Sequence, residues 1–161
     1  MNLKDVTLKN FVELNNKEKL IILSWRNNEI IRKWMYNSEI ILEKNHMKFI
    51  SNLDNDRNNQ YFLVKSSIKN IGVIYFNNIN DDSVEMGIYG NPNIKGTGKI
   101  LMKNLIDYAF NVLKVKKIIS EVYAENIKAY NLYKDFNFQD IKNIIKEDKT
   151  IKHMELNNEN R

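Results

Sequence analysis

The sequence contains no cysteine, and this absence excludes a disulfide framework, thiolate-bound metals, iron–sulfur clusters and a thiol nucleophile. Histidine occurs only as His46 and His153, so we also predict no metal site. Pro92 is the single proline, and no Gly/Ser-rich or Pro-rich linker divides the chain. We therefore expect one domain over residues 1–156, followed by a disordered polar tail at 157–161.

Long apolar runs are also missing, and no segment approaches the roughly 20 residues of a membrane span. The N-terminus has no apolar leader, so we expect a cytoplasmic protein without a membrane partner. The net charge is +5, nearly all of it from lysines spread along the chain, because arginine stands at only four positions. Nucleic-acid binders usually cluster basic residues with aromatics on one face, so we expect no nucleic-acid partner and favour an anionic small molecule.

Apolar periodicity predicts an α/β (α+β) fold with a single mixed, mostly antiparallel sheet of about seven strands flanked by helices. A capping box of Asn15 and Glu18 precedes the first helical stripe. A right-handed crossover would place strands 84–89 and 117–124 parallel to each other. The predicted strands are 6–12, 61–65, 71–76, 84–89, 117–124, 138–145 and 150–156. The predicted helices are one after the Asn15 cap with its apolar stripe at 20–25, followed by 30–35, 43–53, 99–114 and 126–136.

The loop that follows strand 84–89 is the most informative segment. It contains Gly96 and Gly98 and leads directly into a long amphipathic helix. Glycines allow close approach of a ligand, and the free amides of residues 96–100 at a helix start favour an anion, so the loop predicts a phosphate site. Lys95 and Lys99 would add positive charge. Gly-x-Gly before a helix is also ordinary turn chemistry, and the spacing fits neither a Walker loop nor a dinucleotide fingerprint.

Two motifs together resemble the GNAT family of acetyl-CoA-dependent N-acetyltransferases. The family's Gln/Arg-x-x-Gly-x-Gly/Ala motif is matched by Asn93-Ile-Lys-Gly96-Thr-Gly98, with Asn93 in the place of Gln or Arg. The later motif Asn-x-x-Ala-x-x-Leu-Tyr-x-x-x-Gly-Phe is matched from Asn126 to Phe138. In that second motif Asn137 replaces the glycine, an exchange that suits a left-handed helix cap.

The resemblance implies that acetyl-CoA is the cosubstrate and that an amine attacks its thioester directly, so no protein nucleophile is needed. Strands 84–89 and 117–124 would splay apart, and an amide near Ile88 would stabilise the oxyanion. Tyr133 is the implied general acid, against a competing role as a core aromatic, and Glu85 is a candidate base, against simple solvation. The cofactor-binding residues implied by the family are Met86, Gly87, Ile88, Tyr89, Lys95, Gly96, Thr97, Gly98, Lys99, Ile100, Asn126 and Ala129.

The N-terminal third contains Trp25-Arg-Asn27, Trp34-Met35 and His46-x-x-Phe49, and together with Tyr89 these residues resemble one branch of the family. That branch acetylates the 4-amino group of a UDP-linked 4-amino-4,6-dideoxy-N-acetyl-altrosamine in pseudaminic acid biosynthesis. The resemblance implies a nucleotide-sugar pocket formed by Arg26, Met35, His46, Phe49 and Tyr89.

Each of these side chains has a plainer interpretation, as core for Met35 and Phe49 or as a satisfied polar group for His46. The alternatives are acetylation of a ribosomal protein, a polyamine or an aminoglycoside, or an acyl-CoA-binding module without activity. The sequence leaves open whether the chain forms a homodimer.

Overall fold

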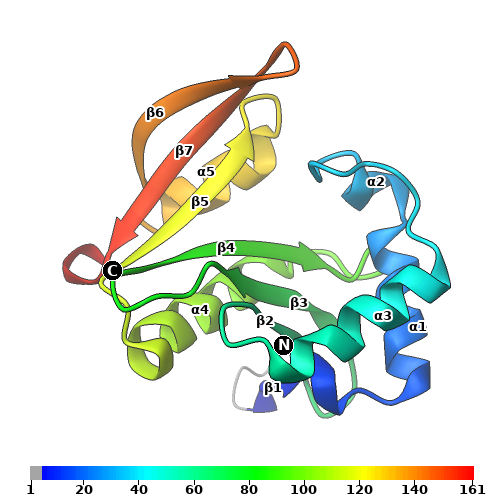
Figure 1. The fold of residues 1–161 in the computed structure, drawn as a ribbon. Coiled ribbons are helices and arrows are strands. Elements are labelled where there is room, and N and C mark those ends of the chain that lie inside the picture. Colours follow the sequence, from blue (N-terminus) through cyan, green and yellow to red (C-terminus); the bar gives the residue numbers. More distant parts are fainter. Residues whose placement is uncertain (1–4) are drawn as a thin grey trace.

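The computed structural model describes residues 5–161 and places seven strands in one sheet of order β1-β2-β3-β4-β5-β7-β6 (Figure 1). Only β4 and β5 run parallel, and the other neighbouring strands are antiparallel. The predicted mixed, mostly antiparallel sheet is therefore confirmed. The strands are β1 Thr7–Asn10, β2 Gln60–Lys65, β3 Asn70–Asn77, β4 Ser83–Gly90, β5 Lys117–Tyr123, β6 Gln139–Lys146 and β7 Lys149–Asn157.

Asparagine side chains begin three of the helices. Asn15, Asn28 and Asn126 each accept a hydrogen bond from an amide of the first turn, which satisfies a donor that the helix itself leaves free. At the other end of α5, Asn137 has a φ of 69°, which confirms the expected left-handed cap. The helices are α1 Asn16–Arg26, α2 Glu29–Arg32, α3 Glu43–Asn52, α4 Gly98–Tyr108, which continues as a π-helical turn over Ala109–Leu113, and α5 Ile127–Asp135.

Apolar side chains cover both faces of the sheet. One cluster joins β2 and β3 to α1 and α3, with Trp25 and Ile50 from the helices against Leu63 and Val73 from the strands. The larger cluster lies on the opposite face under α4 and α5 and includes Tyr133. None of the helices within residues 5–161 is long and apolar enough to cross a membrane.

The parallel pair β4 and β5 stays together only at its start. Ser83, Val84 and Glu85 pair with Lys117, Ile118 and Ile119, and the two strands then diverge (Figure 1). From Met86 onward, β4 is bonded to β3 on one edge and has no strand on the other. The predicted splay is confirmed, and it leaves a row of backbone groups free at the centre of the sheet.

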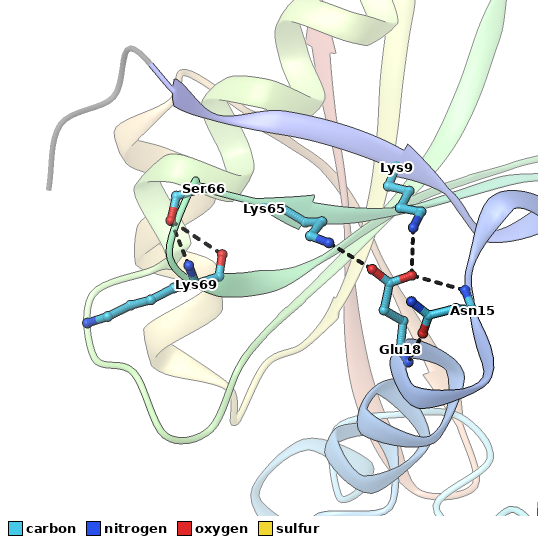
Figure 2. Close-up of polar contacts among 6 residues, drawn as sticks. All are labelled: Lys9, Asn15, Glu18, Lys65, Ser66 and Lys69. Carbon is cyan, nitrogen blue, oxygen red and sulfur yellow. Dashed lines mark hydrogen bonds and ion pairs between the residues drawn. The ribbon is translucent and has the colours of Figure 1, made fainter.

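The edge of the sheet next to α1 is joined to that helix by a buried carboxylate (Figure 2). Glu18 accepts hydrogen bonds from Lys9 of β1 at 2.8 Å and from Lys65 of β2 at 2.7 Å. It also accepts the Asn15 amide at 3.1 Å, which completes the predicted capping box. The side chain of Glu18 is 8% exposed, so this network attaches α1 to two strands from beneath the surface.

Both ends of the chain differ from the expectation. The first strand ends at Asn10, because the Asn10 side chain accepts the Val12 amide and starts a 3-10 turn that buries Phe11. At the C-terminus, Asn157 belongs to β7, and Asn158–Asn160 form a 3-10 turn. The Asn137 side chain donates to the Asn160 carbonyl, so this segment is ordered by hydrogen bonds although its composition is polar.

Candidate active site

A cavity of about 990 Å³ opens at the splay between β4 and β5. Its walls come from α2 and the turn after it, from Tyr75 of β3, from the two splayed strands, from the loop before α4 and the start of α4, and from one side of α5. Every cofactor-binding residue expected from the sequence lines it except Ile100, which follows Lys99 in the first turn of α4. The cavity therefore joins the two sequence motifs in one place.

The N-terminus of α4 supplies free donors to this cavity. Unlike α1, α2 and α5, α4 has no side chain that caps its first turn, although its N-cap residue is Thr97. The unpaired amides and the helix dipole together favour an anion at this end. Lys95 and Lys99 line the same wall. These features fit the phosphates of a nucleotide-bearing cofactor.

The two glycines of the loop serve different purposes. Gly96 has a φ of 75° and open space where a Cβ would stand, so its role is conformational. At Gly98 a Cβ would lie 2.9 Å from Leu132 Cδ2, so this glycine allows α4 to pack closely against α5. A side chain at Gly98 would therefore point at α5, while Gly98 itself lines the cavity, and its part in cofactor binding stays a prediction.

Tyr133 lines the cavity from α5 and is 7% exposed. Its ring packs on Phe138, with ring centroids 5.7 Å apart, so it is both a core aromatic and a cavity residue. Burial raises the pKa of Tyr133 to about 12, which keeps the phenol protonated at neutral pH. A protonated hydroxyl in this position can donate a proton to a leaving group.

Two carboxylates near the splay differ in their access to the cavity. Glu85 is exposed, accepts a hydrogen bond from Asn78 at 2.9 Å and does not line the cavity. Glu121 on β5 lines it and accepts a hydrogen bond from the Tyr36 hydroxyl. Our sequence reasoning missed Glu121. The sequence offered only the alternation that puts Glu121 on the same strand face as Ile119, and the pairing of Ile119 with Glu85 beside the splay comes from the structure.

The residues expected to bind the acceptor divide into two groups. Met35 and Tyr89 line the cavity. Arg26 lies beside it, close enough to Tyr89 and Tyr75 for electrostatic interaction, although burial lowers the pKa of its guanidinium. Its Nη2 donates to the Asn37 carbonyl at 2.8 Å, and its Nη1 is buried without a hydrogen-bond partner.

His46 and Phe49 lie on α3, away from the cavity lining. The His46 ring is 5% exposed, and its Nε2–H donates to the Lys19 carbonyl at 2.8 Å, which ties α3 to α1. Burial lowers the pKa of His46, so the neutral ring is favoured. Phe49 packs edge-on against Tyr61. Both side chains therefore make contacts between α3 and its neighbours, His46 with α1 and Phe49 with β2.

Residues 22–138 match the Acetyltransferase (GNAT) family. This match covers more than half of the chain and includes the splay, the loop before α4 and α5. The protein belongs to the GNAT family and is an N-acetyltransferase.

Individual relatives agree with this assignment. Acetyltransferase PseH of Campylobacter jejuni subsp. jejuni serotype O:23/36 (strain 81-176) is 42% identical over 149 residues, which cover 92% of each chain. The crystal structure of Campylobacter jejuni N-acetyltransferase PseH in complex with acetyl coenzyme A superposes with a TM-score of 0.79 at 37% identity, covering 95% of this chain and 99% of that one. Spermidine N(1)-acetyltransferase of Vibrio cholerae is 28% identical over 139 residues, or 66% of this chain and 80% of that protein.

Proposed function

We propose that the protein transfers the acetyl group of acetyl-CoA to the 4-amino group of a UDP-linked 4-amino-4,6-dideoxy sugar in pseudaminic acid biosynthesis. The observation that carries this proposal is the 42% identity to Acetyltransferase PseH along 92% of both chains. A solved PseH of the same fold is described as a complex with acetyl coenzyme A. The cavity at the splay offers this chain a matching place for such a cofactor.

Acetyl-CoA supplies an activated acetyl thioester, and the residues of this chain position it. The free amides at the start of α4 would hold the pyrophosphate. The free edge of β4 from Met86 to Tyr89 would pair with the pantetheine, as an added strand does. The Ile88 amide lies on this edge and would donate to the oxygen that becomes negative during attack.

Two side chains would handle protons. The Tyr133 hydroxyl, kept protonated by burial, would donate to the departing thiolate. Glu121 is better placed than Glu85 to receive a proton from the attacking amine, directly or through water, because only Glu121 lines the cavity. The hydrogen bond from Tyr36 would hold that carboxylate in position.

The acceptor would occupy the end of the cavity near α2, between Met35 and Tyr89. Near this end, Arg26 and Arg32 each have a buried guanidinium N–H without a partner among the described residues, Nη1 of Arg26 and Nε of Arg32, and such a donor suits a diphosphate. Because the UDP part does not react, its binding would position the sugar amine against the thioester. His46 and Phe49 would support this wall through α3 without touching the acceptor.

Polyamine acetylation is the rival that a specific observation favours. The Vibrio cholerae relative acetylates spermidine according to its name, and Glu121 could attract a cation. Three carboxylates line the cavity, those of Glu121, Glu125 and Asp135, but four lysines line it too, and one of them, Lys33, lies at the end near α2, where its charge would repel a polyamine.

The test is steady-state acetylation of three amines side by side: the UDP-linked 4-amino sugar, the same sugar without UDP, and spermidine. We expect a kcat/KM for the UDP-linked sugar at least about 100-fold above that for the free sugar, because remote binding energy is lost. Arg26→Ala should reduce this preference and leave acetyl-CoA affinity, measured by calorimetry, unchanged. Equal kcat/KM for the two sugars, or a preference for spermidine, would remove the nucleotide-sugar assignment.

A further inference from the structure

The eight tyrosines of the chain fall into two sets with different hydroxyl environments. Four donate hydrogen bonds within the protein, and none of these lines the cavity: Tyr36 to Glu121, Tyr61 to Asn77, Tyr108 to Gln60 and Tyr130 to Asp140. The other four, Tyr75, Tyr89, Tyr123 and Tyr133, all line it. Within residues 5–161, no hydrogen-bond partner is found for any hydroxyl of this second set.

None of the four hydroxyl oxygens is among the buried side-chain atoms that lack a partner, so in the free protein water can reach them. A substrate that fills the cavity would displace this water, and each hydroxyl would then need a polar partner on the substrate, because an unpaired polar group is costly to desolvate. The four cavity hydroxyls would be paired once polar groups of the substrates occupy the cavity. The proposed function assigns Tyr133 to the leaving thiol, so the remaining three are available to the acceptor.

Of these three tyrosines, Tyr75 has its ring fixed by contacts on two sides. It stacks on Tyr61 with ring centroids 4.9 Å apart and planes 8° from parallel. Its register partner on β4 is Gly87, and a Cβ on that glycine would clash with Tyr75 Cζ and with the hydroxyl oxygen. The ring therefore crosses β4 where that strand has no side chain, and its hydroxyl is delivered to the splay.

Tyr75 and Tyr133 approach this point from opposite faces of the sheet. Tyr75 packs against the cluster under α1 and α3, whereas Tyr133 belongs to the cluster under α4 and α5. They are close enough for electrostatic interaction. Tyr133 would thus protonate the thiolate from the face under α4 and α5. Tyr75 lies on the other face, where α2 lies and where the acceptor would bind.

We infer that the Tyr75 hydroxyl is an acceptor-binding group that hydrogen-bonds a polar atom next to the reacting amine, and that Gly87 makes room for it. This inference rests on the proposed function only in placing the acceptor on the α2 side of the splay. It adds a specificity residue on β3, outside both family motifs. Burial raises the pKa of Tyr75, so the hydroxyl stays protonated and can both donate and accept.

The test compares Tyr75→Phe with Tyr61→Phe. Both changes remove one hydroxyl and keep the stacked rings, but only Tyr61 loses a hydrogen bond within the protein, the 3.0 Å bond to Asn77. For Tyr75→Phe we expect kcat/KM for the acceptor to fall about tenfold or more, since the acceptor atom loses its partner. Its acetyl-CoA affinity and melting temperature should stay at wild-type values. Tyr61→Phe should show the reverse, a lower melting temperature with unchanged acceptor kinetics.

The kinetics are measured with the UDP-linked 4-amino sugar and with spermidine. A wild-type enzyme that acetylates only spermidine would refute the proposed function, and the tyrosine comparison would then be decided on spermidine. Wild-type acceptor kcat/KM in Tyr75→Phe would overturn the inference. So would an equal loss of acetyl-CoA affinity, because the hydroxyl would then serve the cofactor.

Discussion

The buried carboxylate of Glu18 allows a quantitative prediction for Glu18→Gln. Burial alone would raise the pKa of Glu18, but hydrogen bonds from Lys65, Lys9 and the Asn15 amide outweigh it and lower the pKa from 4.5 to about 2. The gap between these two values corresponds to about 3 kcal/mol of folding free energy. The two lysines keep 31% and 30% of their side-chain area exposed, so water screens part of the interaction, and we expect about 2 kcal/mol.

The Glu18→Gln substitution removes only the negative charge, because a glutamine side chain can still accept a hydrogen bond from the Asn15 amide and preserve the capping box. At pH 7 the variant should unfold at a lower denaturant concentration, with a melting temperature about 4–8 °C below wild type for a chain of this size. The pKa is depressed in the fold, so the stabilisation is complete above pH 4.5 and is lost as the pH falls toward 2. The difference between the two proteins should therefore narrow by about a quarter at pH 4.

The assay is urea unfolding followed by circular dichroism at pH 8, 7, 5 and 4, with Glu13→Gln as the matched control. Glu13 is exposed and lies in the 3-10 turn before α1, so its change should alter stability by less than about 0.5 kcal/mol. A Glu18→Gln protein as stable as the control at pH 7 would refute the reasoning. A stability gap that stays constant from pH 8 to pH 4 would refute the electrostatic part of it.

Two further substitutions test the roles given to single side chains. Tyr133→Phe should lower kcat by about 100-fold or more and leave the melting temperature unchanged, and rapid-quench kinetics of the chemical step would show whether the hydroxyl acts as an acid. Unchanged chemistry would make Tyr133 purely structural. His46→Ala should destabilise the fold by about 2 kcal/mol in urea unfolding and leave the acceptor KM at the wild-type value, because the ring bonds Lys19 and not the cavity. A raised KM with normal stability would return His46 to the acceptor site.

The backbone architecture could be predicted because its signals are local or nearly local. The capping box at Asn15, the left-handed residue at Asn137 and the parallel pairing of β4 with β5 all follow from short patterns and from the handedness of crossovers. Most of the expected cofactor half of the site lies on one continuous segment, from β4 through the loop to the start of α4, and only Asn126 and Ala129 come from the start of α5. The relative positions of these residues therefore follow largely from their order in the sequence.

The acceptor half could not be predicted in the same way, because it depends on which face of a helix meets which neighbour. His46 and Ile50 are one turn apart on α3, and both are buried. Spacing shows that they share a face, but it does not say whether that face meets a cavity or another helix. The C-terminal turn was missed for a related reason, since the hydrogen bond to Asn160 comes from Asn137, more than 20 positions away in the chain.

The tyrosines show what information would have completed the prediction. By composition all eight are equivalent, and by periodicity Tyr61 and Tyr75 are both ordinary strand residues. The register between strands separates them. Tyr61 pairs with Tyr75 on β3. Tyr75 pairs on its other side with Gly87 of β4, two residues beyond Glu85, the last residue of β4 that pairs with β5. The ring of Tyr75 extends across Gly87, because this glycine has no side chain to block it. Its polar end then faces the cavity at the gap in the sheet, where we propose that a substrate atom pairs with it.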